Sequence, residues 1–276
     1  MSDRRFAFVQ WEFPGRLGPP PGRYPVRRFA GDSVQEILVI GGAAAPVPRR
    51  RRGRGGPPAP VEATRATVID ATPLEGRVAA EAWLERAAGA DADSVLEAAL
   101  RLLNRAVAGH RLATADPYVP DADPRRALAS RVGYGSGDQV AEGEWEAARE
   151  LAVPPLSVSR ALAPHERLAA LLSGRDVALA CEELALRARL DIDQGRGREG
   201  AMQAHLALEA AVAELESWRE QGDMGRRLED LGGRRGVLAA AANAALAGGL
   251  EPEAEEAVAE ALGRVEAALR ARASTV

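Results

Sequence analysis

The chain has 276 residues and a net charge of −4, and all 36 of its basic residues are arginine. The absence of lysine excludes a P-loop and a Schiff-base enzyme, because both need a lysine amine and the guanidinium group of arginine stays charged. The single cysteine, Cys181, excludes an intrachain disulfide and a cysteine-rich zinc site. No apolar run approaches the roughly 18 residues that a membrane span requires. We therefore expect a cytoplasmic protein with no membrane-spanning segment, and we expect no cofactor.

Residues 1–73 are predicted to form a small β-rich head. Aromatic and β-branched residues gather there in four short runs, at 5–13, 23–29, 35–40 and 64–70, which is typical of strands. In the first run Ala7, Val9, Trp11 and Phe13 occupy alternate positions, so they are expected to face the same side of an antiparallel sheet.

Residues 42–62 are rich in proline, glycine and arginine and have little to bury, so we expect a disordered loop within the head. Arginine pairs with phosphate through two N–H groups, which makes the basic tract in this loop a candidate polyanion-binding site. Two alternatives are an acidic protein surface as its partner and a solvated linker whose arginines reflect composition alone. The tract consists of Arg49, Arg50, Arg51, Arg52 and Arg54.

Residues 74–276 are predicted to form a mostly α-helical body, with a possible sub-boundary near 152–163. Leu96, Leu100, Leu103 and Val107 recur at helical spacing and predict one amphipathic helix. Short helices are also predicted at 124–130 and 139–151, where nearby prolines and glycines mark the ends of each segment. Head and body together predict an α+β protein.

Longer helices are predicted at 175–193, 199–220 and 253–272. The second of these has an apolar stripe at steps of three and four residues, formed by Ala201, Ala204, Leu208, Ala211, Leu215 and Trp218. The turns at Gly195 and Gly249 resemble the helix-turn-helix of tetratricopeptide repeats, but they lie 54 residues apart, against roughly 34 in that family. We therefore interpret both turns as general helical hairpins. The Ala-rich last helix allows homo-oligomerisation without requiring it.

A glycine-rich stretch before the predicted helix at 139–151 is the best candidate for a ligand loop. Glycines before a helix can expose backbone N–H groups to an anion, and Arg131 lies close by in the sequence. The stretch is not a dinucleotide-binding G-x-G-x-x-G motif, and it is not a G-x-S-x-G nucleophile motif either. The alternative is a purely structural loop whose last residue caps the helix. The stretch comprises Gly133, Tyr134, Gly135, Ser136, Gly137 and Asp138.

The histidines and the cysteine give no catalytic or metal-binding pattern. His165-Glu166 begins like an H-E-x-x-H zinc motif, but residue 169 is alanine, and no histidine pair has metal-ligand spacing. Cys181 lies between Val177 and Leu184 on the expected apolar side of a helix, so it is interpreted as a core residue. We assign no catalytic, cofactor-binding or metal-binding residue.

Three functions remain open from the sequence. The leading hypothesis is a non-enzymatic interaction or assembly protein that binds an unknown protein partner through its helical hairpins and basic loop. The second is a nucleic-acid-associated factor that binds phosphates through the tract at 49–54. The third is an enzyme with an anion or phosphate site at 133–138.

Overall fold

The computed structural model describes residues 4–27, 30–45, 61–152 and 164–273. The chain divides into two compact units, residues 1–156 and residues 157–276, which we call the sheet unit and the helical unit. The boundary near residue 73 and the sub-boundary near 152–163 stay predictions. The loop predicted at 42–62 is too long at both ends, because residues 42–45 and 61–62 lie in strands. The tract at 49–54 lies outside the described residues.

The sheet unit contains a six-stranded antiparallel sheet in the order β2-β3-β4-β1-β5-β6. The first four strands correspond to the four predicted runs, which confirms the β-rich N-terminal part of an α+β fold. The last two strands come from the part that was predicted to be helical. The strands are β1 (Arg5–Pro14), β2 (Gly22–Val26), β3 (Glu36–Ala45), β4 (Val61–Asp70), β5 (Ala129–Ser136) and β6 (Ala147–Glu150).

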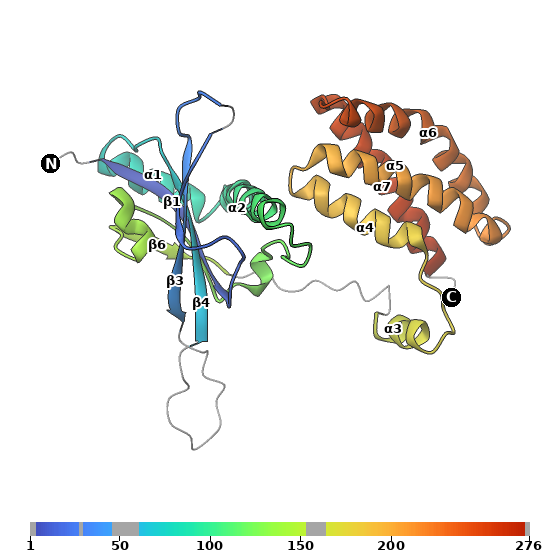
Figure 1. The fold of residues 1–276 in the computed structure, drawn as a ribbon, viewed down its shortest axis with the longest axis horizontal. Helices are drawn as coiled ribbons and strands as arrows, with labels where there is room; N and C mark the ends of the chain where they lie inside the picture. Colours follow the sequence, from blue (N-terminus) through green and yellow to red (C-terminus); the bar gives the residue numbers. More distant parts are fainter. Residues whose placement is uncertain (1–3, 28–29, 46–60, 153–163, 274–276) are drawn as a thin grey trace, which may run out of the picture. The chain divides into compact units, whose positions relative to one another are not determined.

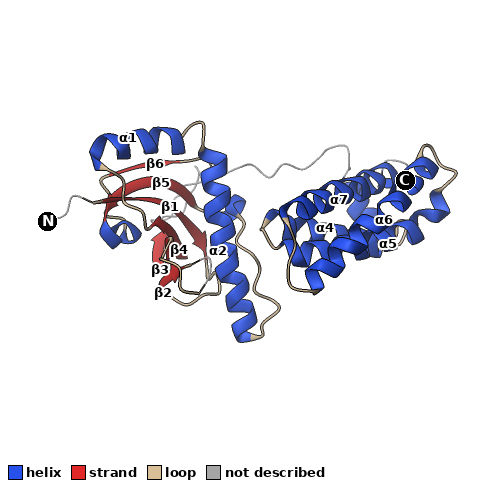
Figure 2. Ribbon diagram, turned by 90° about the horizontal axis from the view of Figure 1, so that it is seen from above, coloured by secondary structure: helices blue, strands red, loops and turns tan. Residues whose placement is uncertain are grey.

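Two helices, α1 (Gly76–Ala87) and α2 (Ala92–Thr114), cover one face of this sheet (Figure 2). Val9, Trp11 and Phe13 of β1 pack into the core beneath them, as the alternating pattern predicted. Leu103 and Val107 of α2 are fully buried, which confirms the predicted apolar stripe. The sheet and these two helices therefore fold as one unit, which is why the unit extends well beyond residue 73.

The predictions of a loop at 133–138 and of helices at 124–130 and 139–151 were wrong. Strand β5 occupies 129–136 and pairs with β1 and β6. The segments predicted as helices contain only the short 3₁₀ turns η1 (Pro124–Arg126) and η2 (Gly137–Glu142), and residues 147–150 form β6. Gly133 belongs in this strand because the ring of Phe8 lies across it. A Cβ at Gly133 would come within 2.6 Å of Phe8 Cζ and 2.5 Å of the Ala147 carbonyl oxygen. Here glycine marks a close approach and not a flexible loop.

The helical unit consists of α3 (Pro164–Leu172), α4 (Ala180–Asp193), α5 (Gly197–Glu214), α6 (Met224–Leu246) and α7 (Pro252–Ala273), with a 3₁₀ turn, η4 (Leu215–Trp218), after α5. Helices α4 to α7 pack around one alanine-rich core (Figure 2), and α3 lies outside this bundle (Figure 1). The predicted stripe on α5 is confirmed, because its first five members are completely buried. Val177 was expected on the apolar side of α4, but it precedes that helix and is 65% exposed.

We expect Gly133→Ala to destabilise the sheet unit by about 2 kcal/mol, because the added methyl group would overlap Phe8 and the backbone of β6. The matched control is Gly41→Ala, since a Cβ at Gly41 in β3 meets nothing within 4 Å. Urea unfolding of the full chain, followed by tryptophan fluorescence, measures both changes. Equal stability of the two variants would contradict the close packing of Phe8 on β5.

Candidate functional site

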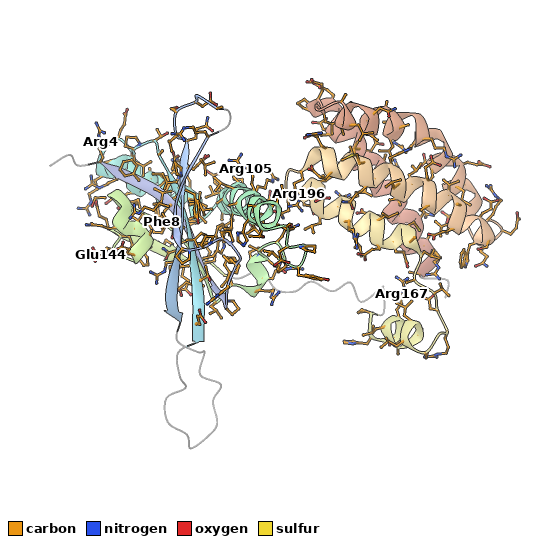
Figure 3. All side chains as sticks on the ribbon, viewed as in Figure 1. Arg4, Phe8, Arg105, Glu144, Arg167 and Arg196 are labelled. Carbon is orange, nitrogen blue, oxygen red and sulfur yellow. The ribbon has the colours of Figure 1, made fainter. Side chains whose placement is uncertain are left out.

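The face of the sheet opposite α1 and α2 has an apolar half covered by η2 and the segment after it (Figures 1 and 3). Phe8 is 1% exposed and packs against Ile69, Val140 and, with ring centroids 5.7 Å apart, Trp145. Beside them the fully buried Gln10 donates from Nε2 to Thr67 Oγ1 at 2.9 Å and to the Val140 carbonyl at 3.3 Å. These contacts fix the position of η2 on the sheet.

Three charged side chains occupy the next positions on the same face. Glu12 on β1 lies between Arg65 on β4 and Arg131 on β5, and its Oε1 accepts hydrogen bonds from Arg65 Nη2 and Arg131 Nη1, each at 3.1 Å. The Glu12 side chain is only 9% exposed, whereas the two arginine side chains retain 22% and 20%. We call this group the Glu12 cluster.

The residues of the predicted ligand loop divide between the two faces of the sheet. Arg131 belongs to the Glu12 cluster, but Tyr134 packs into the core on the helix-covered face and is 4% exposed. A Cβ on Gly135 would come within 2.7 Å of Val140, so this glycine, like Gly133, is explained by packing. Ser136 ends β5 and is exposed, and Gly137 and Asp138 begin η2. The structure therefore does not bring these residues together as one loop.

In the helical unit, buried charges join the start of α4 to the end of α7. Arg272 is 2% exposed, and its Nη2 donates to Asp176 Oδ1, while its guanidinium lies 5.0 Å from the centroid of the Trp218 ring. Arg167 of α3 also donates to Asp176 and to Glu182 of α4, and Figure 3 shows it on the side of α3 toward the bundle. Sequence reasoning missed this network because its members lie up to 96 residues apart.

The pKa of Asp176 is lowered in this network. Burial acts to raise the pKa of this carboxyl group, but the Val177 N–H and the guanidinium groups of Arg272 and Arg167 outweigh it. The network thus holds a charged carboxylate in the protein interior, where its ionised form depends on these donors.

A groove of about 290 Å³ runs between α4 and α7. The two helices are antiparallel, because Glu182 lies near Arg272 at 3.7 Å while Arg189, further along α4, bonds to Glu266 at 2.8 Å. Apolar side chains line the groove and charged ones border it. The apolar residues are Ala185, Leu186, Leu269 and Ala273, and the charged residues are Arg167, Glu182, Glu266 and Arg270.

The thiol of Cys181 is not placed to act as a nucleophile. Cys181 is completely buried, and burial together with the Glu214 carboxylate raises the pKa of its thiol, which opposes thiolate formation. Within the four described ranges, no group of three histidine, cysteine, aspartate or glutamate side chains is placed to hold a metal ion. None of the helices described is long and apolar enough to cross a membrane.

Comparisons of the chain with family models, curated proteins and solved structures gave no match.

The lowered pKa of Asp176 predicts a specific pH dependence of stability. Its contribution is present above the unfolded pKa of about 3.9 and is lost as the pH falls through the lower folded value. We expect Asp176→Asn to destabilise the helical unit by about 3 kcal/mol at neutral pH, with a smaller difference below the unfolded pKa.

Denaturant unfolding of the full chain across a pH series measures this effect. Asp223→Asn is the matched control, because Asp223 pairs with Arg226 and Arg227 at the surface, where ion pairs contribute little. A difference that stays constant across the pH series would contradict an ionised Asp176 in the folded state.

Proposed function

We propose that this protein is a non-enzymatic interaction protein and that the groove between α4 and α7 binds an amphipathic helix of a protein partner. The groove carries the proposal, because it combines an apolar floor with a charged border. Leu186 lines the groove on the α4 side, and 68% of it is exposed to solvent. A partner helix that inserts an apolar side chain beside Leu186 would remove this surface from water.

The charge at the border supports a partner helix with an acidic residue. Glu182 and Glu266 are already paired, with Arg167 and Arg189 respectively. Arg270 is exposed at the border, and within residues 164–273 it forms no ion pair. A partner carboxylate placed opposite Arg270 would be matched, which favours an acidic amphipathic helix over a basic one.

The surface of α3 adds apolar area to the same unit. Leu168 and Leu172 are 54% and 81% exposed, and α3 has no buried residue. A nine-residue helix is too short to be stable alone in water, so α3 depends on what it contacts, including the bonds of Arg167. A partner that covers α3 as well as the groove would stabilise both.

The other two hypotheses have less support. Nucleic-acid binding through Arg49–Arg54 stays a prediction, because that tract lies outside the described residues. The hypothesis of an enzyme site at 133–138 required backbone N–H groups exposed before a helix. Gly133 and Gly135 instead lie in strand β5, which pairs with β1 on one side and β6 on the other. Location in the cytoplasm also stays a proposal, based on the single unpaired cysteine.

We test the groove with a photo-crosslinking residue, p-benzoylphenylalanine, in the full chain in native lysate. We expect a protein crosslink when this residue replaces Leu186 and none when it replaces Leu206, which is 55% exposed on α5 but does not line the groove. Leu186→Glu should reduce capture of the same partner about tenfold, since it places a charge in an apolar contact, whereas Leu206→Glu should not.

Equal crosslinking at the two positions would contradict a specific partner in the groove. A crosslink to a second copy of this chain would identify the occupant as the same protein and would replace the proposed partner by a homo-oligomer.

A further inference from the structure

The Glu12 cluster carries one positive charge more than its carboxylate can neutralise. Arg65 Nη2 and Arg131 Nη1 share a single acceptor atom, Glu12 Oε1. The nearest further acid is Glu150, whose Oε2 is 3.9 Å from Arg131 Nε and whose side chain is 67% exposed, so this pair is long and well solvated. Two guanidinium groups are thus held close together with one buried counter-ion between them.

Donors remain on both arginines for a further anion. A guanidinium group has five N–H donors. Arg65 bonds to Glu12 through Nε and Nη2, and Arg131 through Nη1. In the described part of the sheet unit, Arg65 Nη1 and Arg131 Nη2 donate no hydrogen bond. Neither nitrogen is among the fully buried, unpartnered polar atoms of the described residues, and the two arginine side chains are about one-fifth exposed.

The surroundings leave room next to the guanidinium groups. Gly41 of β3 lies opposite Arg65 in the strand register, and a Cβ there would meet nothing within 4 Å. On the other side, Gly143 has φ of +97°, and a Cβ at that position would lie 3.7 Å from Arg65 Nη1. Trp145, two residues further along the chain, contacts the other arginine: the guanidinium carbon of Arg131 lies 5.9 Å from the centroid of its ring. Gly41 thus leaves open space beside Arg65, while the turn at Gly143 lies against Arg65 and the Trp145 ring lies against Arg131.

We propose that Arg65 and Arg131 form a binding site for the phosphate group of a small ligand, with Glu12 as the internal counter-ion that holds the two guanidinium groups in place. The planar N–H fork of arginine matches phosphate oxygens and binds them through two parallel hydrogen bonds. The ligand is either inorganic phosphate or a phosphate monoester, since both present the same oxygens to the cluster. This site is in the sheet unit and does not depend on the groove in the helical unit.

Isothermal titration calorimetry of the full chain at low ionic strength tests the site with two probes, inorganic phosphate and a nucleoside monophosphate. We expect Arg65→Gln and Arg131→Gln each to weaken binding about tenfold, because each removes one of two guanidinium groups. Arg149→Gln is the control, since Arg149 is an exposed arginine of β6 that pairs with Glu85 of α1 on the other face. Tighter binding of one probe identifies the source of the phosphate group.

The variant Glu12→Gln distinguishes a binding site from a purely stabilising cluster, because phosphate affinity and melting temperature should change in opposite directions. It removes the internal counter-ion, so phosphate affinity should rise about tenfold even where the melting temperature falls. If the cluster only stabilises the sheet, Glu12→Gln lowers the melting temperature and neither probe binds. If Glu12→Gln does not fold, Arg131→Lys serves instead, because it keeps the charge and should recover part of the affinity that Arg131→Gln loses. Absence of saturable heat in the parent chain, or equal losses in the Arg131→Gln and Arg149→Gln variants, would overturn the proposal.

Discussion

Pairing between buried carboxylates and arginine is the constraint on which both units depend. The chain has no lysine, so every long cationic side chain is a guanidinium group with several donors in a fixed plane. In the sheet unit Glu12 is shared by two arginines, and in the helical unit Asp176 is shared by Arg167 and Arg272. In each case one carboxylate joins segments far apart in the sequence. Removing the shared carboxylate would leave two neighbouring guanidinium groups without their common counter-ion, which is more costly than losing a surface ion pair.

The elements with strong periodicity could be predicted from the sequence. The β1 alternation placed Trp11 and Phe13 on the buried side, and steps of three and four placed Ala204 and Leu208 in the core of the helical unit. Strand β5 was missed, because its glycines gave the signal of a loop. That signal has a different cause here: β5 must pass under Phe8, and only a residue without a Cβ fits. A single sequence does not show which aromatic ring will cross which strand.

The candidate surfaces were predictable only in part. Arg131 was singled out from the sequence, but its partners Glu12 and Arg65 were not, since strand pairing brings them together over separations of 119 and 53 residues. One signal was available: Glu12 is a charged residue between Trp11 and Phe13 in a mostly apolar strand, and a buried carboxylate needs a cation nearby. Helical hairpins were expected in the helical unit, but the groove depends on α4 and α7, which adjoin only because the bundle closes between its first and last helices.

One pull-down from native lysate distinguishes a protein partner on the helical unit from a nucleic acid on the basic tract, because the two predict different captured proteins. The full chain is compared, with and without nuclease, with a variant in which a short Gly-Ser linker replaces residues 46–60, and captured proteins are identified by mass spectrometry. A protein that binds the α4–α7 groove is retained under nuclease and by the linker variant, and it is lost on Leu186→Glu. Partners that disappear with nuclease or with the linker variant, and that Leu186→Glu leaves in place, would contradict an interaction protein acting through its helical unit.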